Sequence, residues 1–190
     1  MELFFIFNEM NPGTLLVATP SVMGDGNFHR AVVLLVNHSD SGSIGFILNK
    51  KIEYTLDEVL EGVLSKQPLY FGGPVEPDNL FYIHTLGSQI SKSIPITDSL
   101  YWNGDFEEVV QLLEAGKLNE ENIRFFLGYS GWSEGQLEAE LEEKSWEPFV
   151  EKTPLELIKM PIERMWQECM IALGGTYLLW SNAPDNPRFN

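Results

Sequence analysis

The residues most able to do chemistry lie in one stretch, "GYSGWSEGQLEAEL", which runs from Gly128 to Leu141. Its first five residues nearly match the G-x-S-x-G elbow that exposes a nucleophilic serine, but Trp132 stands where the last glycine is required. That glycine is needed because the strained turn from strand to helix has no room for a side chain. Ser130 also needs a histidine base. All three histidines (His29, His38, His84) lie in the first half of the chain, so the pattern disfavours a nucleophilic serine.

Helix capping accounts for the same stretch without any chemistry. If Ser133 is the N-cap of a helix, Gln136 falls at its N3 position, where the two side chains can form a capping box. Trp132 and Leu137 then take the positions of a hydrophobic staple, and the glutamates that follow face solvent. Glu134 lies in the first turn and already satisfies the helix dipole, which weakens the case for an anion site. We therefore predict a helix start at this corner.

The histidines and the single cysteine do not form a metal-binding pattern. No two histidines stand at the H-x-H, H-x₃-H or H-E-x-x-H spacing of a metal site, and Cys169 is isolated from all of them. His84 follows an alternating apolar stretch, which favours a strand residue that hydrogen-bonds across a sheet. The sequence therefore predicts neither a metal nor a cofactor.

The stretch "FGGPVEPDN" (Phe71–Asn79) is a tight backbone device. Gly72 and Gly73 permit positive φ, while Pro74 fixes its own φ and restricts the residue before it. Such a device can present bare N–H groups to a ligand, but it more often reverses a strand. It is not followed by G-K-[ST], so it is not a phosphate loop, and it is not a dinucleotide fingerprint. A turn is the favoured interpretation and a ligand cradle is the alternative.

The elements that would position these residues are mostly strands early in the chain and helices late. Strands are predicted at residues 14–19, 30–37, 44–49, 69–71 and 80–86, with a last strand at 176–182. Capping residues predict helices that begin at Thr55, Asp105, Thr153 and Pro161, although the third of these could be a strand. The fold class is therefore α+β, with a mostly antiparallel or mixed sheet.

Two of these helices carry a more detailed prediction. Thr55 with Glu58, and Asp105 with Glu108, have the spacing of capping boxes. The helix after Thr55 is expected to bury one apolar face between residues 56 and 64, and the helix after Asp105 is expected to end near Gly116.

Size and cysteine content predict a single cytosolic domain over residues 1–190. A chain of this length can bury roughly 70% of its unfolded surface, so it needs no disulfide or metal to fold. With one cysteine, no internal disulfide can form, and a reducing cytoplasm is the natural compartment. The apolar run Leu3–Phe7 is too short for a signal peptide or a membrane span, and we interpret it as a docking strand or helix tip.

The charge of the chain disfavours partners that are themselves anionic. The formal net charge is −16, with 10 acidic against 5 basic residues in 1–95 and 18 against 7 in 96–190. DNA and anionic lipid attract basic surfaces, and the only adjacent basic pair is Lys50–Lys51. Most of the acidic residues are best explained as solvated helix faces that keep the protein soluble. Direct nucleic-acid binding and a membrane partner are therefore not expected.

Four stretches in the same order carry a resemblance to a known family: "GTLLVATPSVMGDGNFHRAVVLLVNHSDSGSIGFILNK", "FGGPVEPDNLFYIHTLG", "FFLGYSGWSEGQLEAELEEKSW" and "MWQECMIALGG". From about Pro12 to the C-terminus the chain resembles the AlgH/YqgE family of small bacterial proteins. The resemblance implies a single-domain α+β fold whose bifurcated, barrel-like β-sheet is flanked by helices. It also implies a bacterial cytosolic protein of unassigned activity, labelled a transcriptional regulator through its AlgH member. The family often has alanine where this chain has Ser130.

The resemblance supplies motif positions but no catalytic set. The matching residues are His38, Asn49, Gly72, Gly73, Pro74, His84, Gly128, Gly131, Trp132, Gly135, Gln136 and Glu138. The leading hypothesis is a non-catalytic binding or regulatory protein that acts through a protein partner or a small ligand. We take as its candidate site His38, Asn49, Gly72, Gly73, His84, Gln136 and Glu138.

Two alternatives stay open at this point. The first is an enzyme acting on a small metabolite, in a cleft formed by the GGPV turn, His84 and the "GWSEGQ" corner, where one histidine could serve general acid–base chemistry. The second is a structural subunit of an assembly, which would expose an apolar contact patch. The first alternative requires the three segments to converge.

Overall fold

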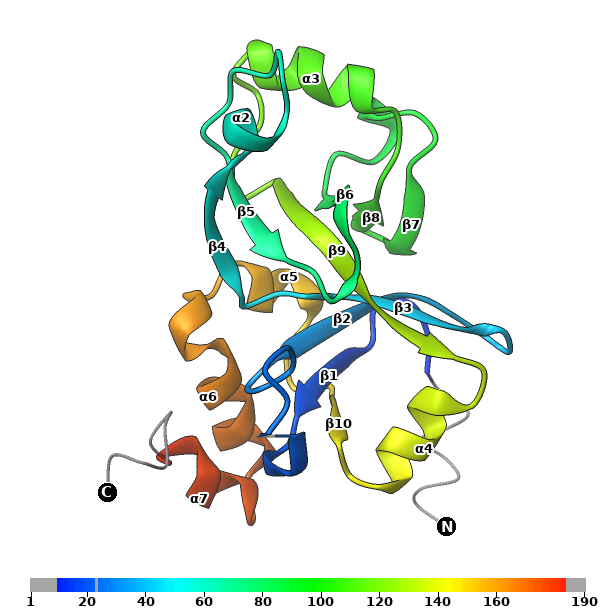
Figure 1. Ribbon diagram of the computed structural model, residues 1–190, viewed down its shortest axis with the longest axis vertical. Coiled ribbons are helices and arrows are strands. Elements are labelled where there is room, and N and C mark those ends of the chain that lie inside the picture. The colour runs from blue at the N-terminus through cyan, green and yellow to red at the C-terminus, as the bar shows by residue number, and fades with distance from the viewer. Residues whose placement is uncertain (1–9, 23, 184–190) are drawn as a thin grey trace.

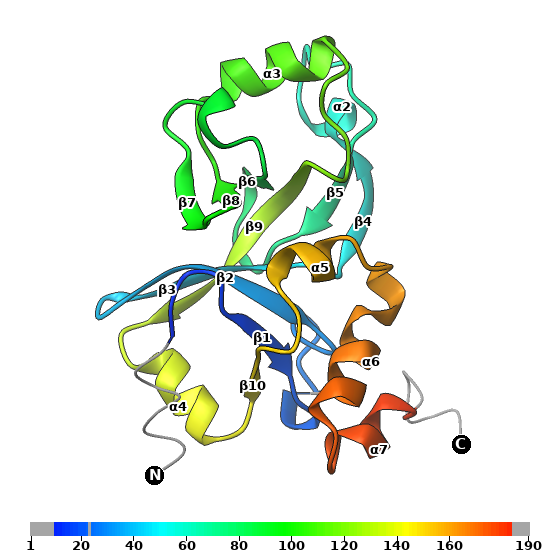
Figure 2. The same ribbon diagram turned by 180° about the vertical axis from the view of Figure 1, so that it is seen from behind.

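The computed structural model describes residues 10–22 and 24–183, so the predicted docking segment Leu3–Phe7 lies outside the described residues. In the described part the chain forms a ten-stranded sheet with helices on its flanks (Figures 1 and 2). The strands are β1 (Leu15–Ala18), β2 (Val32–Ser39), β3 (Gly42–Ile47), β4 (Lys51–Thr55), β5 (Pro68–Phe71), β6 (Val75–His84), β7 (Ile94–Thr97), β8 (Leu100–Trp102), β9 (Ile123–Ser133) and β10 (Trp146–Phe149).

The helices follow in two groups. The α-helices are α2 (Leu56–Val59), α3 (Phe106–Glu114), α4 (Gln136–Glu142), α5 (Pro154–Ile158), α6 (Ile162–Leu173) and α7 (Tyr177–Ser181), and two short 3₁₀ turns are η1 (Pro20–Val22) and η2 (Gly87–Gln89). In Figure 1, α2 and α3 lie with β4–β8 in the upper half, and α4–α7 lie with β1, β2 and β10 in the lower half. The predicted α+β class is confirmed.

Strand β9 joins the two halves because three strands pair with it. Along one edge it pairs antiparallel with β6, from Val75 opposite Tyr129 to His84 opposite Ile123. Along the other edge its first half pairs parallel with β5 and its second half pairs antiparallel with β3. The sheet therefore forks at β9 and does not close into a barrel, which confirms the bifurcated, mixed sheet.

The fork requires glycine where two backbones cross. A Cβ atom added at Gly73, which has φ +153°, would lie 2.2 Å from the carbonyl carbon of Tyr129. A Cβ added at Gly128, with φ +68°, would lie 2.4 Å from the carbonyl oxygen of Gly73. No real Cβ fits at such distances, so the turn from β5 to β6 can lie directly on β9 only without side chains. The GGPV segment is thus the place where two backbone segments of the protein cross in direct contact.

The apolar core is built from alternating strand residues and one face of each long helix. In the lower half, Met165, Trp166, Cys169 and Met170 of α6 are buried against β1 and β2, and the Trp166 indole donates to the carbonyl of Ala18 at 2.7 Å. In the upper half, buried Val109 of α3 packs over the other end of β9. Each helix therefore covers the sheet with the apolar stripe that its sequence spacing provides.

The segment left open between helix and strand is a helix, and so is the last predicted strand. Residues 154–158 form α5, whose capping box at Thr153 has the Glu156 carboxylate accepting from the Thr153 N–H at 2.7 Å. The predicted last strand is helix α7. Gly174 and Gly175, both at positive φ, reverse the chain onto α6. There the Gln167 amide donates to the carbonyl of Ser181, which holds the segment beside a helix instead of a sheet edge.

The first two predicted helices also differ in detail. Helix α2 has only four residues, and Leu64, which was expected on its buried face, is 94% exposed. At α3, Asp105 caps the N–H of Glu107 as predicted, but Glu108 accepts hydrogen bonds from Ser91 in place of completing a capping box. Gly116 follows the end of α3 with φ +65°, as expected for a helix stop.

Among residues 10–22 and 24–183, no helix combines the length and the apolar character needed to cross a membrane.

Candidate ligand-binding site

His84, the best sequence candidate for acid–base chemistry, is a structural histidine. It ends β6, its side chain is 1% exposed, and its ring stacks on Tyr101. Nδ1 accepts from the N–H of Leu86 at 3.3 Å, so the proton lies on Nε2, which donates to the carbonyl of Asn103 at 3.0 Å. Burial lowers the pKa of His84, which keeps the ring neutral in this setting.

The three segments of the proposed enzyme cleft lie at separate points along β9. His84 is opposite Ile123 at the start of this strand, the glycine crossing contacts its middle, and the "GWSEGQ" corner follows its end. An 11-residue strand spans about 35 Å at roughly 3.3 Å per residue. The structure therefore does not bring His84 to the corner, and the convergence that the enzyme hypothesis needs is missing.

Ser130 lies in the middle of β9 and not at an elbow. Its side chain is fully buried, and its hydroxyl donates to the carbonyl of Gly72 at 3.0 Å. The hydroxyl therefore ties the glycine crossing to β9.

Gln136 at the corner reaches back along the chain as predicted, but the helix begins later. Its side-chain oxygen accepts from both the N–H and the hydroxyl of Ser133, at 3.0 and 3.1 Å. Ser133 is still in β9, and the N-cap of α4 is Gly135 with φ 71°. The predicted serine N-cap is wrong because the strand continues through this residue and a left-handed glycine makes the turn. Trp132 and Leu137 belong to one buried cluster, as the staple requires.

Glu140 has a structural role that sequence analysis missed. Its Oε2 atom accepts from the indole N–H groups of Trp132 at 2.9 Å and Trp146 at 2.7 Å, and its Oε1 accepts from the Gln136 amide. This carboxylate therefore satisfies two buried indoles, and the expectation that the glutamates of this helix all face solvent is wrong. The two tryptophans that flank the helix were the available signal.

The other candidate residues divide between the two ends of β2. His38 hydrogen-bonds Ser43 Oγ through Nδ1 at 2.7 Å, and its Nε2 lies 4.0 Å from a carboxylate oxygen of the half-exposed Glu138. Asn49 accepts from the N–H of Val32 and donates to the carbonyl of Arg30, which fastens the start of β2 to the end of β3. His38, Glu138 and Gln136 thus gather near the corner, whereas Asn49 does not.

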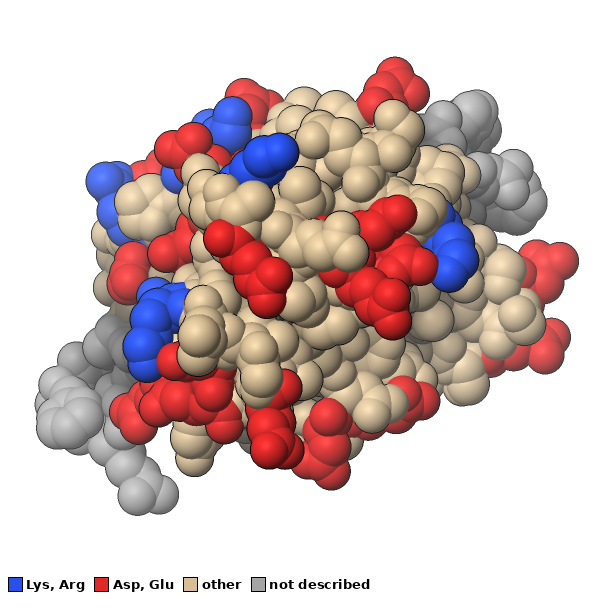
Figure 3. All heavy atoms as spheres, turned by 90° about the horizontal axis from the view of Figure 1, so that it is seen from above, with Lys and Arg blue, Asp and Glu red and all other residues tan. Residues whose placement is uncertain are grey.

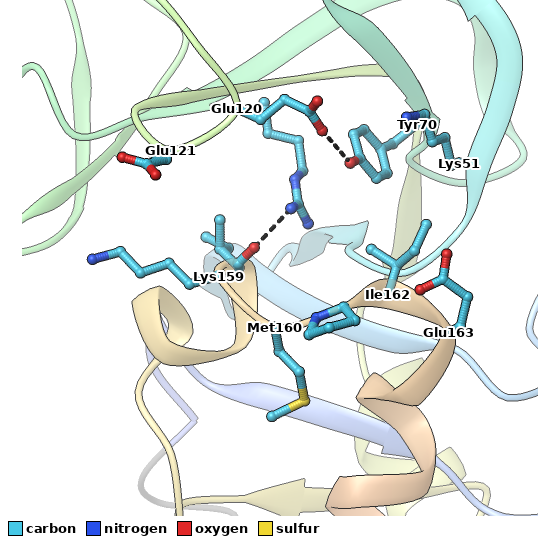
Figure 4. Close-up of a pocket in the computed structure, with 11 residues that line it drawn as sticks. Lys51, Tyr70, Glu120, Glu121, Lys159, Met160, Ile162 and Glu163 are labelled. Carbon is cyan, nitrogen blue, oxygen red and sulfur yellow. Dashed lines mark hydrogen bonds between the residues drawn. The ribbon is translucent and has the colours of Figure 1, made fainter.

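The described residues enclose a pocket of about 530 Å³ between the upper half of the sheet and the turn from α5 to α6 (Figure 4). This volume is in the range of small-molecule sites. Its lining combines charged side chains with an apolar surface, and comprises Lys51, Tyr70, Glu120, Glu121, Arg124, Ile158, Lys159, Met160, Pro161, Ile162 and Glu163.

Arg124 is the unusual member of this lining. The residue is only 5% exposed, and its guanidinium donates to the carbonyls of Leu48 at 2.9 Å and Ile158 at 2.8 Å. It lies 4.4 Å from the ring centre of Tyr70, and its Nε has no hydrogen-bond partner. Burial lowers the pKa of Arg124, but a guanidinium stays charged in proteins. In the described structure no carboxylate forms an ion pair with this buried cation.

The sequence did contain a signal for this residue. Arg124 stands inside the apolar run "NIRFFLG", in a strand whose neighbouring positions are buried. Charged residues are rarely buried unless they are paired, so an arginine at such a position marks either a structural pin or a binding group.

Both signs of charge surround Arg124 at the mouth of the pocket. Figure 4 shows Lys51 and Glu163 on one side and Lys159 and Glu121 on the other. Glu120 accepts a hydrogen bond of 3.3 Å from the Tyr70 hydroxyl. The pocket therefore has three cationic and three carboxylate side chains around an apolar floor.

Nothing in the described part of the chain marks a metal centre, since residues 10–22 and 24–183 contain no group of three or more His, Cys, Asp or Glu side chains that could hold an ion.

The forked sheet and its glycine crossing define a class of α+β proteins to which solved structures can be compared. The AlgH solution structure from Pseudomonas aeruginosa matches with a TM-score of 0.70 and 30% identity, covering 91% of this chain and 94% of that one. A crystal structure of a Corynebacterium diphtheriae protein matches with a TM-score of 0.71 over 93% and 94% of the two chains. At 24% identity, the second match shows the fold alone.

Sequence comparison identifies the family. The AlgH-like family model matches residues 15–178, and this chain belongs to that family. A UPF0301 protein of Cytophaga hutchinsonii is 45% identical over 183 residues, which cover 95% of this chain and all of the relative. A UPF0301 protein of Bacteroides thetaiotaomicron is 39% identical and covers 94% of this chain and 90% of its own. The predicted family is confirmed.

Proposed function

We propose that this protein is a non-catalytic binding protein that holds a small ligand in the Arg124 pocket and regulates a protein partner through that binding. The observation that carries the proposal is the buried guanidinium of Arg124, which has carbonyl and ring contacts but forms no ion pair with a described residue, so that Glu120 acts on it only at longer range. An unpaired buried charge costs several kcal/mol. A ligand group of negative charge in the pocket would offset part of that cost.

The regulatory part of the proposal rests on the transcriptional-regulator label of the family and on the net charge of the chain. A direct contact with DNA is opposed by the net charge of −16, so we propose that regulation acts through a protein partner. The cytoplasm is the proposed compartment. Its support is that Cys169 is a free thiol and the single cysteine of the chain, so the fold uses no internal disulfide.

A thermal-shift screen of the purified full-length chain tests this function. The panel contains nucleotides, amino acids, organic acids, sugars, divalent metals and short duplex DNA. A ligand at 100 times its dissociation constant adds about 2.7 kcal/mol, which is readily visible as a rise in Tm. We expect one class of small metabolite to raise Tm, and nuclear magnetic resonance to show that metabolite unchanged after long incubation.

Two variants assign the binding to the pocket. Arg124→Met removes the buried charge and keeps a side chain of similar size. Lys159→Glu reverses a charge at the rim of the pocket, where we expect the substitution to leave folding unchanged. Lys117→Glu is the matched control, since Lys117 is exposed and does not line the pocket. A panel without any hit, a hit that the pocket variants leave unchanged, or turnover of the ligand would each overturn the proposal.

A further inference from the structure

The charges around Arg124 point to a ligand that is itself both positive and negative. This inference deepens the proposed function and rests on it, because it names the ligand of the same pocket. We infer that the pocket binds a free amino acid in its zwitterionic form, with an apolar side chain. Four features of the pocket support this choice. They concern the ligand's net charge, its carboxylate, its ammonium group and its side chain.

The first feature is the balance of charge. A simple anion would meet Arg124, Lys51 and Lys159, but also three carboxylates and the field of a chain with net charge −16. A simple cation would meet the buried guanidinium directly. A zwitterion has no net charge, so the long-range field does not repel it, and each end can still find an opposite charge at short range.

The second feature is a place for the ligand's carboxylate. Arg124 lines the pocket as a buried cation that forms no ion pair in the described structure, and guanidinium groups bind carboxylates in a planar, directional manner. The N-terminus of the 12-residue helix α6 lines the same pocket, and its N-cap is Pro161, which provides no side-chain cap. Glu163 in the first turn of α6 already compensates part of the helix dipole, so the helix end adds less here than the buried guanidinium does. The buried cation therefore marks the carboxylate position, beside the start of α6.

The third feature is a place for the ammonium group. Glu163 lies in the first turn of α6, and its carboxylate accepts no hydrogen bond and forms no ion pair in the described structure. In an amino acid the ammonium is one carbon away from the carboxylate group. A carboxylate held at the start of α6 therefore brings the ammonium within reach of Glu163. Glu120 is the less available acid, since it already accepts from Tyr70.

The fourth feature is the apolar floor. Ile158, Met160 and Ile162 line the pocket on the side of the α5–α6 turn, and Figure 4 shows Ile162 facing Tyr70 while the Met160 side chain runs away from it. These side chains can cover an aliphatic or aromatic group but offer no hydrogen bonds. Leucine, methionine and phenylalanine therefore fit better than glutamate, lysine or serine, whose polar ends would lose their hydration there.

Calorimetric titration of the full-length protein tests the inference with ligand analogues. L-leucine, L-methionine and L-phenylalanine are compared with N-acetyl-L-leucine, which lacks the ammonium, and L-leucinamide, which lacks the carboxylate. We expect each analogue to bind at least tenfold more weakly than L-leucine. Glu163→Gln should weaken L-leucine about tenfold and leave N-acetyl-L-leucine unchanged, whereas the exposed control Glu142→Gln should change neither. The analogue arms need no variant, so they decide the question even if Arg124→Met fails to fold.

The outcomes separate this inference from the proposed function. Equal binding of L-leucine and L-leucinamide, or of L-leucine and its acetyl derivative, would overturn the zwitterion. If the amino acids are silent but a nucleotide or organic acid binds and loses affinity in Lys159→Glu, the inference fails while the proposed function stands. If no small molecule of the panel binds, both fail together.

Discussion

His84 and Arg124 are basic side chains buried near the β5–β6 part of the sheet, and both are held by carbonyl oxygens and not by opposite charges. His84 donates to Asn103, and Arg124 donates to Leu48 and Ile158. The difference lies in their response to burial. The imidazole avoids the cost of desolvation by staying neutral, but the guanidinium cannot lose its proton. Of the two, only Arg124 keeps a charge that a ligand could use.

The lowered pKa of His84 predicts a loss of stability at mildly acidic pH. In the unfolded chain a histidine titrates near 6.5, and burial lowers the pKa in the folded protein. Below about pH 6.5 the unfolded state therefore binds more protons than the folded state. The free energy of unfolding keeps its full value above that pH and falls as the pH drops toward the folded pKa. Urea unfolding at pH 7.5, 6.5 and 5.5 measures this slope.

The matched variant for this test is His84→Gln, whose amide keeps an N–H donor but does not titrate. We expect the variant to lose less stability than the wild type between pH 7.5 and 5.5. Hydrogen bonds lower the pKa of carboxylates such as Asp105 and Glu156, so the stability that these groups contribute is lost only at more acidic pH. Identical slopes for the two proteins would contradict the assigned role of His84.

At the scale of elements, the glycine crossing on β9 predicts a sharp contrast between two glycine substitutions. Gly73→Ala places a methyl group 2.2 Å from the backbone of Tyr129, and the crossing strand cannot move away without breaking the fork. We expect a loss of about 3 kcal/mol or more. Gly26→Ala has no atom within 4 Å of the added Cβ and should stay within about 0.5 kcal/mol of the wild type. Chemical unfolding followed by circular dichroism measures both, and equal losses would refute the crossing.

Local sequence chemistry predicted the elements better than it predicted their partners. Thr153 begins a helix as its capping role predicts, and Gly116 stops α3, because these signals act over three or four residues. The tail after Gly175 was misassigned because a short apolar run is compatible with either strand or helix, and only contact with α6 decides. The parallel pairing of β5 with β9 depends on residues more than fifty positions apart, so no local pattern reveals it.

The candidate site shows the same limit, since short motifs predict local structure better than long-range contacts. The residues taken from motifs, such as Gly73 and Gln136, turned out to shape the chain where it crosses or turns. The pocket was not foreseen, because β4, β5, β9 and the α5–α6 turn meet only in the folded chain. Arg124 carried the one local clue, a charge inside an apolar strand.

At the scale of the whole molecule, excess negative charge predicts that salt stabilises the fold. Figure 3 shows acidic side chains spread over the face seen from above, with fewer basic ones among them. Repulsion within a chain of net charge −16 opposes the compact state, and salt screens it, with a Debye length of about 10 Å at 0.1 M. We expect Tm to rise by about 2–4 °C between 20 and 300 mM sodium chloride, corresponding to roughly 1 kcal/mol.

A charge variant provides the control for the salt effect. The double substitution Glu142→Lys and Glu143→Lys changes two exposed residues of α4 and lowers the net negative charge. Its Tm should rise less with salt than that of the wild type. The same samples should show no mobility shift of duplex DNA at low salt. A salt-sensitive shift at a specific sequence would contradict the expectation that regulation avoids direct DNA contact.

The central position of β9 has a consequence for how the protein is made. Strands β3, β5 and β6 are synthesised long before β9, and β1 waits still longer for β10. At roughly 5–20 residues per second, β3 stays without its central partner for on the order of 10 s after it leaves the ribosome. During that time apolar strands are exposed without their partner β9, and only local hairpins or chaperones protect them. A nascent chain that stops before Ile123 lacks the strand that joins the two halves, so folding is an event of the last third of translation.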